Sequence, residues 1–252
     1  MADFTIQIAD TPIAVSSLFD STRDYCRAYL TEKPSAFSVT VTREDLDYEQ
    51  SALLAEALEE GMKPRVFTDP FLDRAAIQRK VAEGLLERDV LLFHGSTVAV
   101  DGAAYLFTAE CGTGKSTHTR YWRQVFGDRA VMVNDDKPFL KITDSGVLAC
   151  GAPWSGKHGL DTNIIVPLQG ICILRRGSEN RIRPISCAEA MNMLLKQSIP
   201  PRDPEMLPLF RSLADKLAET VSLWQMDCTK DPKAAQIAHA AMAGGDPCTE
   251  NV

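Results

Sequence analysis

The chain has 252 residues, of which 45% are hydrophobic and 24% are charged, and its formal net charge is -7. These values are ordinary for a folded globular protein and argue against a long disordered chain. No cationic block accompanies the acidic balance, so we expect no binding to nucleic acid or to an anionic membrane.

Seven cysteines are scattered along the sequence, and no two of them form a C-x-x-C pair. An odd number without short spacings indicates neither a disulfide framework nor a zinc site. The first residues lack the basic patch, apolar run and cleavage site of a secretory signal, and no apolar stretch approaches the roughly 20 residues that span a bilayer. We therefore expect a cytoplasmic protein.

Residues 1–89 predict a small α+β region. Strand patterns at 4–9 and 37–41 alternate with helical patterns at 43–60 and 72–88. Thr42 is the expected N-cap of the first of these helices, and Gly61 is expected to end it. We expect this region to cover the site or to face its substrate.

From residue 90 the pattern changes to closely spaced strands. Apolar runs at 97–100 and 103–108 flank Asp101 and Gly102, and Asp-Gly between two apolar runs is typical of a β-hairpin. A glycine-rich segment, a helical pattern at 117–126 and an apolar strand that ends at Asn134 follow. Further strands are expected at 146–150 and 170–174.

The last quarter is predicted to be mostly helical. Ser186 and Glu189 have the spacing of a capping box ahead of AMNMLLKQ. A proline-rich break, a short strand at 221–225 and a final helix at 232–242 follow, and the tail GGDPCTENV is expected to fray. Residues 90–245 therefore form the expected core domain with its helical C-terminal part.

The segment Ala109–Ser116 has the form of a phosphate-binding loop, although the pattern ordinarily begins with glycine. A glycine-rich turn that opens a helix supplies converging N–H groups and the positive end of the helix dipole. Lys115 would reach the terminal phosphates of a nucleotide, and the Ser116 hydroxyl would bind Mg²⁺. The expected nucleotide-binding residues are Cys111, Gly112, Thr113, Gly114, Lys115, Ser116 and Thr117.

Two adjacent carboxylates, Asp135 and Asp136, end the strand that follows the loop and its helix. P-loop enzymes place a second metal contact at this position. Because successive side chains of a strand point in different directions, one carboxylate can hold the cation while the other accepts a proton from an attacking hydroxyl. The sequence leaves open which of the two has which role.

The stretches FHGSTVAVDG, AECGTGKST and VNDD together resemble the superfamily of HPr serine kinase and ATP-type phosphoenolpyruvate carboxykinase. PWSGKHGLDTNIIVPLQGICIL resembles a segment of the HPr kinase-related proteins of bacteria. The specific motifs span residues 93–174, and the resemblance covers most of the chain. It implies an α/β fold in which a P-loop core with a mixed β-sheet follows a smaller α+β region and precedes a helical part.

The resemblance also implies roles for single residues. His94 is expected to bind the metal or to contact its acidic partner, Asp136 to hold the metal, and Asp135 to accept the proton. Lys157, in the loop PWSGKHG, is expected to reach the transferring phosphoryl group. Trp154 and Asn163 are weaker candidates for contacts with the substrate.

One departure from the resembled family limits the reaction. The carboxykinases follow the two acids with another acid and a histidine, whereas this chain has Lys137 and Pro138, and it is much shorter than those enzymes. We therefore do not expect decarboxylation. Arg120 and Arg123 lie on the helix after the loop, where most arginines form a solvated face. The arginines at 175, 176, 181 and 183 could bind an anionic substrate or product, or could equally belong to an ordinary turn.

The sequence thus predicts a kinase that uses ATP or ADP and Mg²⁺ to phosphorylate a serine-type hydroxyl of a small molecule or peptide. One alternative is a nucleotide-binding sensor without turnover. Another is a phosphorylase or phosphatase that acts on a phosphoserine substrate. Assembly into a homo-oligomer is compatible with the resemblance, but the sequence identifies neither an interface nor the acceptor.

Overall fold

The structure is a computed structural model that describes residues 2–59, 61 and 63–244. The chain divides into two compact units, Met1–Leu85 and Leu86–Val252. Both units combine helices with strands, so the protein has a mixed α/β fold. Among the described residues, no helix has the length and apolarity that crossing a membrane requires.

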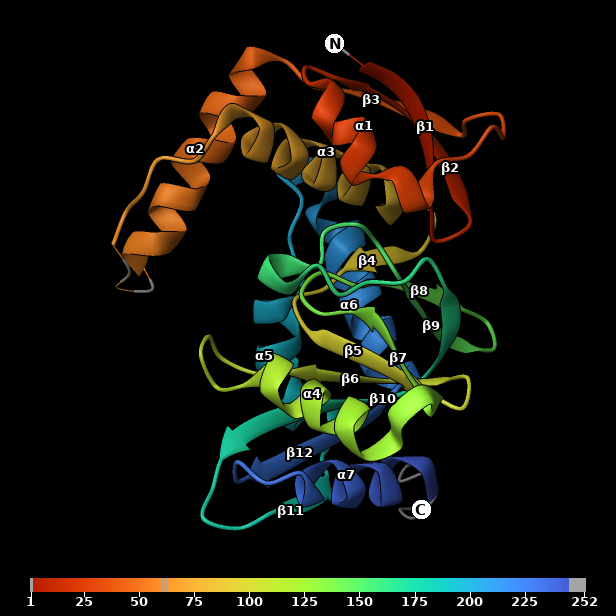
Figure 1. Cartoon of the computed structure of the whole chain (residues 1–252), viewed down its shortest axis with the longest axis vertical. Helices are drawn as coiled ribbons and strands as arrows, with labels where there is room; N and C mark the ends of the chain where they lie inside the picture. The colour runs from red at the N-terminus through yellow and green to blue at the C-terminus, as the bar shows by residue number, and fades with distance from the viewer. Residues whose placement is uncertain (1, 60, 62, 245–252) are drawn as a thin grey trace. The chain divides into compact units, whose positions relative to one another are not determined.

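The first unit contains a three-stranded sheet, drawn in red to orange in Figure 1, whose strand order is β1-β2-β3. Strands β1 (Ala2–Ile8) and β2 (Thr11–Ser17) are antiparallel, and β3 (Phe37–Thr40) runs parallel to β2. Ala9 and Asp10 join the first two strands with φ of 49° and 64°, as a tight hairpin turn requires. The sequence pattern predicted β1 and β3 but not β2.

Helices α1 (Asp20–Tyr25), η1 (Arg27–Tyr29), α2 (Arg43–Glu59) and α3 (Asp69–Leu86) complete the first unit. The predicted N-cap of α2 is confirmed, because the Thr42 hydroxyl accepts the Asp45 N–H at 3.4 Å. Asp45 in turn accepts the Thr42 N–H at 2.8 Å. Arg79 of α3 pairs with Asp45 and Glu49 of α2, which ties the two helices together.

The described part of the second unit contains a nine-stranded mixed sheet. Its strands are β4 (Val90–Leu92), β5 (Ser96–Val100), β6 (Ala103–Thr108), β7 (Ala130–Asn134), β8 (Phe139–Thr143), β9 (Gly146–Cys150), β10 (Ile165–Arg176), β11 (Arg181–Pro184) and β12 (Ser222–Cys228). The main path runs β4-β8-β9-β10-β6-β5-β7, and β12 joins β10 to β11. The long strand β10 pairs with β9 through its first residues and with β6 and β12 through its last.

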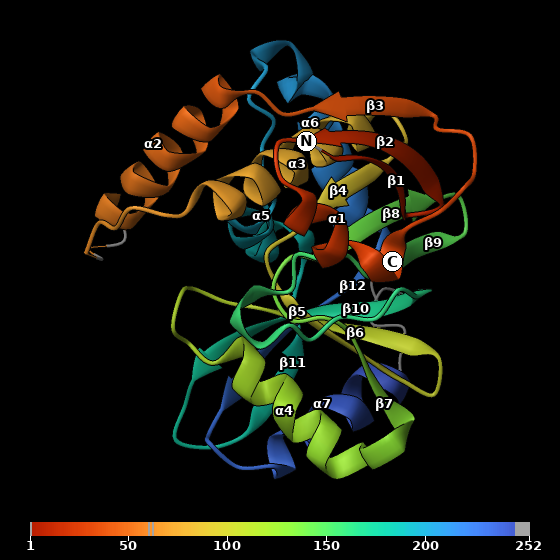
Figure 2. The same ribbon diagram turned by 45° about the horizontal axis from the view of Figure 1, so that its top comes forward.

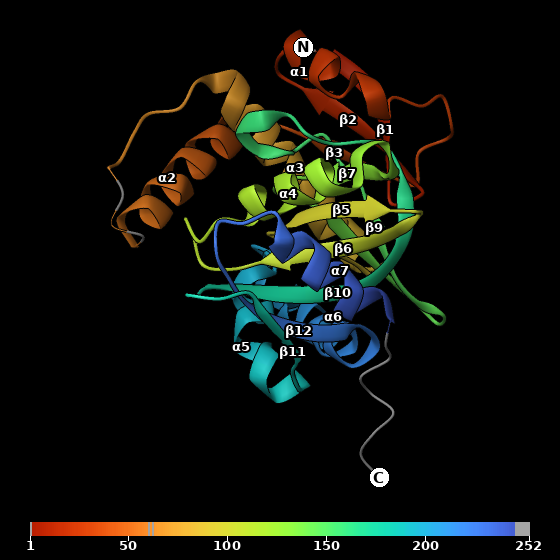
Figure 3. The same cartoon turned by 60° about the horizontal axis from the view of Figure 1, so that its bottom comes forward.

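Strand directions bring several loops to one edge of this sheet. Strand β5 is antiparallel to both β6 and β7, so β6 and β7 run in the same direction. Strand β10 is parallel to β6 and to β12. The C-terminal ends of β6, β7, β10 and β12 therefore meet at the same edge, and Figure 3 shows β5, β6, β10 and β12 in succession.

Helices cover both faces of the sheet. Helices α4 (Lys115–Phe126) and α7 (Lys233–Gly244) pack on one face, against side chains such as Tyr105 and Phe107 of β6. Helices α5 (Cys187–Gln197) and α6 (Leu207–Thr220) pack on the other, against Leu106 and Ile171. Figure 2 shows α4 and α7 on one side of β6 and β10, and α5 on the other.

Short 3-10 helices lie at Gly127–Arg129, Gly156–His158 and Pro204–Met206. The predicted hairpin at Asp101 and Gly102 is confirmed, since both residues have positive φ between β5 and β6. The predicted capping box is confirmed as well, with Ser186 and Glu189 bonded reciprocally at the start of α5. Of the tail expected to fray, the structure describes only Gly244, which ends α7.

Candidate functional site

The glycine-rich loop, Ala109–Gly114, connects β6 to α4 at the edge where the parallel strands end. Gly112 has φ of 72°, and Gly114, the N-cap of α4, has φ of 119°. A Cβ on Gly112 would meet nothing within 4 Å, so the backbone conformation and not lack of space calls for glycine there. Lys115 Nζ donates to the Ala109 carbonyl at 3.2 Å, which keeps the lysine over the loop.

Asp135 follows β7 and is bonded to the start of β5. Ser96 Oγ donates to Asp135 Oδ1 at 2.6 Å and lies 2.7 Å from Thr119 Oγ1 of α4. All three side chains are buried, and Asp135 is only 7% exposed. This hydroxyl pair joins the carboxylate to the helix that the glycine-rich loop opens. Sequence reasoning did not identify Ser96, because a serine at a strand start carries no distinctive pattern.

Asp136 lies beside His94, as expected from the resemblance. His94 Nε2 is 3.5 Å from Asp136 Oδ1, and the Gly95 N–H donates to the Asp136 carbonyl at 3.0 Å. Burial, together with the positive charges of Lys137 and Lys115, lowers the pKa of His94 to about 3. The imidazole is therefore neutral at pH 7, which is the form that binds metals.

Burial also raises the pKa of Asp136. The positive charges of Lys137 and Lys115 act in the opposite direction, and the charge of Asp135 adds to the increase. A carboxylate whose pKa is raised in this way is a better proton acceptor than an exposed one and gains more from a bound cation. The pKa of Asp136 therefore agrees with either of the two roles considered for it.

Asn134 fixes the turn that carries both carboxylates. Its Oδ1 accepts the N–H groups of Asp136 at 2.8 Å and Lys137 at 2.6 Å. Its Nδ2 donates to the carbonyls of Ala152 at 2.8 Å and Trp154 at 3.3 Å. The motif VNDD contains this asparagine, and the known preference of asparagine for bonds to nearby backbone groups could have identified it.

The segment with Lys157 passes close to Asp136. A Cβ on Gly156 would lie 3.0 Å from the Asp136 Cβ, so the backbone approaches that carboxylate closely. Lys157, the next residue, is exposed. Asn163 is exposed as well. Trp154 is 6% exposed and packs near Phe139, with ring centroids 6.2 Å apart. These surroundings are those of a side chain that packs in the protein interior.

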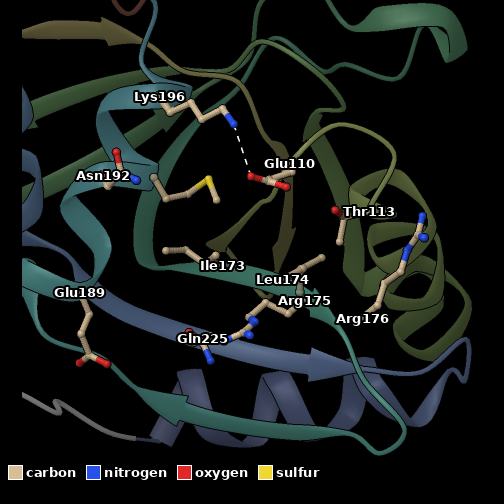
Figure 4. A pocket seen from close by; sticks show the side chains of 11 residues that line it. Glu110, Thr113, Ile173, Leu174, Arg175, Arg176, Glu189, Asn192, Lys196 and Gln225 are labelled. Atoms are coloured by element: carbon tan, nitrogen blue, oxygen red, sulfur yellow. Dashed lines mark hydrogen bonds and ion pairs between the residues drawn. The ribbon is translucent and has the colours of Figure 1, made fainter. Parts of the chain in front are cut away.

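A cavity of about 480 Å³ lies beside the glycine-rich loop, on the side of α5 (Figure 4). Ile173 and Leu174, at the end of β10, contribute apolar surface, and Asn192 of α5 contributes an amide. Lys196 of α5 pairs with Glu110 of the loop at 3.4 Å. The size of the cavity suits a small organic ligand, which would lie against the glycine-rich loop.

Another hollow, of about 220 Å³, lies on the α4 side of the loop and includes Thr117, Tyr121 and Thr229. Arg176 lines both this hollow and the larger cavity. Its Nη2 donates to the Gly112 carbonyl at 2.7 Å, so the end of β10 holds the loop directly. From the sequence, Arg176 was one of four arginines that could bind an anionic substrate or belong to an ordinary turn, and its bond to the loop was not expected.

A cation at this site would need phosphate oxygens among its ligands. Among the described residues, no group of three or more His, Cys, Asp and Glu could hold a metal ion. Mg²⁺ is usually bound by one or two carboxylates together with substrate phosphates and waters. Ser116 lines a hollow with Asp135, whereas His94 pairs with Asp136, so the expected metal ligands form two neighbouring groups.

No family model and no curated protein matches the chain. Among solved structures, the Hpr(Ser) kinase/phosphatase from Coxiella burnetii is similar at 12% sequence identity, with a TM-score of 0.36. The match covers 61% of this chain and 99% of that chain. A likeness this remote concerns the arrangement of elements alone, and no activity follows from it.

Proposed function

We propose that the protein is a nucleotide- and Mg²⁺-dependent kinase that phosphorylates a hydroxyl group. The proposal rests on one observation: the glycine-rich loop and two acidic residues lie at the same edge of the sheet. Asp135 is tied to α4 through Ser96 and Thr119, and α4 begins at Lys115. This arrangement supports transfer of a phosphoryl group held at the loop to an acceptor beside the carboxylates.

The phosphates would bind along the glycine-rich loop. Backbone N–H groups at the start of α4 favour an anion, and Lys115 would turn from the Ala109 carbonyl to the terminal phosphates. Because the carboxylates lie on the β7 side, the nucleoside would extend the other way, towards the end of β10. The cavity of Figure 4 and the hollow at Thr117 both lie on that side.

Mg²⁺ would be held by the Ser116 hydroxyl, by Asp136 with His94 beside it, and by phosphate oxygens, and it would neutralise charge on the transferring group. Asp135 would accept the proton of the acceptor hydroxyl. Lys157 would approach the phosphoryl group from the segment that passes Asp136, adding positive charge where negative charge develops. The exchange of roles between Asp135 and Asp136 stays open.

The burial of Asp135 favours a kinase over a sensor without turnover. A carboxylate that is 7% exposed loses most of its hydration, and Ser96 is its one side-chain hydrogen-bond partner among the described residues. Binding a nucleotide needs the loop and Lys115 but no buried proton acceptor beside them. A second carboxylate at the loop, in addition to one that could hold the metal, is therefore better explained by turnover.

The test is phosphoryl transfer from labelled ATP with Mg²⁺ to free hydroxy compounds and to serine-containing peptides. Wild type is compared with Asp135→Asn, which keeps an oxygen to accept the Ser96 hydrogen bond. We expect label in an acceptor with wild type and its loss in the variant, while ATP binding persists. Tight ATP binding without transfer to any acceptor would support the sensor instead.

A further inference from the structure

A hollow of about 210 Å³ lies on the β7 side of α4 and contains the proposed proton acceptor, Asp135. One face of α4 forms its wall, because Ser116, Arg120 and Arg123 recur at the spacing of helical neighbours. His158, which follows Lys157, also lines it. The hollow thus extends from the end of the glycine-rich loop, past Asp135, to two guanidinium groups.

Several arginines of this unit have acidic partners, whereas Arg120 and Arg123 have none among the described residues. Arg129 pairs with Asp101, and Arg183 pairs with Glu189. Neither Arg120 nor Arg123 forms an ion pair or a side-chain hydrogen bond with a residue that the structure describes, although Arg120 lies near the Tyr121 ring. Two uncompensated guanidinium groups on one wall favour an anionic ligand.

Charge and size together define the ligand class. Among the described residues that line the hollow, Asp135 is the only acidic one, and two arginines oppose it. About 210 Å³ is less than the 300–1,000 Å³ of pockets for drug-sized ligands, so the hollow suits a compound of few heavy atoms. Such a compound would carry a hydroxyl at one end and a negative charge at the other.

We propose that the phosphoryl acceptor is a small hydroxy acid whose hydroxyl meets Asp135 and whose carboxylate binds Arg120 and Arg123. This inference rests on the proposed kinase function and adds the class of acceptor. The acceptor oxygen forms a bond to the γ-phosphorus, the bond from that phosphorus to the β–γ bridging oxygen breaks, ADP leaves, and the hydroxyl proton passes to Asp135. Charge recognition at the arginines places the hydroxyl beside the base.

The experiment compares acidic and neutral acceptors that share a hydroxyl group. Transfer from labelled MgATP is measured for glycerate against glycerol and for L-serine against L-serinamide, with wild type, Arg120→Gln and Arg123→Gln. We expect transfer to the acids and little to the neutral compounds. Because a hydrogen bond to a charged group contributes about 1.5 to 3 kcal/mol, each variant should raise KM for the acid by roughly 10-fold or more.

Arg211→Gln is the matched control, since Arg211 is exposed on α6 and does not line the hollow. This variant should leave the KM for the acid and the KM for MgATP unchanged. The inference is overturned if neutral compounds are phosphorylated as well as acids, if only peptides accept the label, or if the arginine variants raise KM for MgATP alone. Absence of transfer to every acceptor, despite ATP binding, instead contradicts the kinase function itself.

Discussion

Asp135 and Asp136 are neighbours in sequence but lie in different surroundings. Asp135 is bonded to Ser96 and lines a hollow with Ser116, whereas Asp136 lies beside His94 and under Gly156. These surroundings predict different defects when each carboxylate is neutralised. A lost proton acceptor lowers the rate of transfer, and a lost metal ligand lowers the affinity for the cation.

We therefore expect Asp135→Asn to lower kcat by about 10²- to 10⁴-fold while the Mg²⁺ concentration for half-maximal rate stays the same. Asp136→Asn should mainly raise that Mg²⁺ concentration. Steady-state kinetics over a Mg²⁺ titration measure both quantities. The reverse pattern would show that the two residues exchange roles, with Asp135 and Ser116 holding the metal.

Arg176 is the residue through which the end of β10 holds the glycine-rich loop. Removing its bond to the Gly112 carbonyl in Arg176→Ala should loosen the loop and raise KM for MgATP by about 5- to 10-fold, since such a bond contributes about 1 kcal/mol or more. Hydrogen exchange at residues 110–114 should speed up. Arg181→Ala, at an exposed position of β11, is the control. Unchanged exchange in Arg176→Ala would exclude this positioning role.

Several contacts of the site residues could not be predicted from the sequence. The pattern of α4 indicates that Ser116, Arg120 and Arg123 share a helix face. It does not indicate that this face lines a hollow together with His158 and Leu160 of a distant loop. Ser96 and Asn134 were not identified as site residues, because ordinary polar positions at strand ends look the same. Asp135 was singled out from a motif, but its hydrogen bond to Ser96 is encoded by no motif, whereas the approach of His94 to Asp136 was expected from the resemblance.

At the scale of elements, helix α4 contains a buried histidine that predicts a pH effect on stability. His118 is 3% exposed, packs against Phe107 with ring centroids 4.4 Å apart and ring planes tilted by 57°, and accepts the Trp122 indole N–H at 3.1 Å. Burial lowers the pKa of His118 from 6.5 to about 4. The unfolded chain thus binds a proton more readily, so this contribution to stability is complete above pH 6.5 and is lost as the pH falls towards 4.

Between pH 7.5 and pH 5, the His118 contribution should lower the free energy of unfolding by about 2 kcal/mol. Urea unfolding at the two pH values measures it. His118→Gln keeps an oxygen to accept the Trp122 N–H but cannot titrate, so its pH dependence should be smaller by that amount. An equal pH dependence in both proteins would assign the effect to other groups.

The elements around the site were predicted better than those elsewhere. Strand β6, the loop, α4 and β7 carry distinct hydrophobic periods and a glycine signal, and the structure contains them in that order. Strand β2 was not predicted, because the preceding turn is Ala9-Asp10 and lacks the glycine or asparagine that typically marks a hairpin. Strand β11 has exposed arginines at alternate positions, a pattern that is also typical of loops. Its strand conformation follows from pairing with β12, which its own sequence does not predict.

At the scale of the whole molecule, the division into two compact units predicts that each unit has its own free energy of unfolding. Every residue proposed to bind nucleotide, metal or acceptor belongs to the unit that begins at Leu86. A ligand that binds only the folded form stabilises it by about 2.7 kcal/mol at a concentration of 100 times Kd. MgATP should therefore stabilise the second unit against unfolding by about this amount, and no direct stabilisation of Met1–Leu85 follows from the proposed contacts.

Urea unfolding can separate the units, since Trp122, Trp154 and Trp224 all lie in the second unit and report on it by fluorescence. Hydrogen exchange resolved by peptide reports on Met1–Leu85. We expect MgATP to shift the fluorescence transition to higher urea while exchange in the first unit changes less, and Lys115→Met to abolish the shift. Equal protection of both units would mean that they unfold cooperatively, or that the nucleotide contacts both.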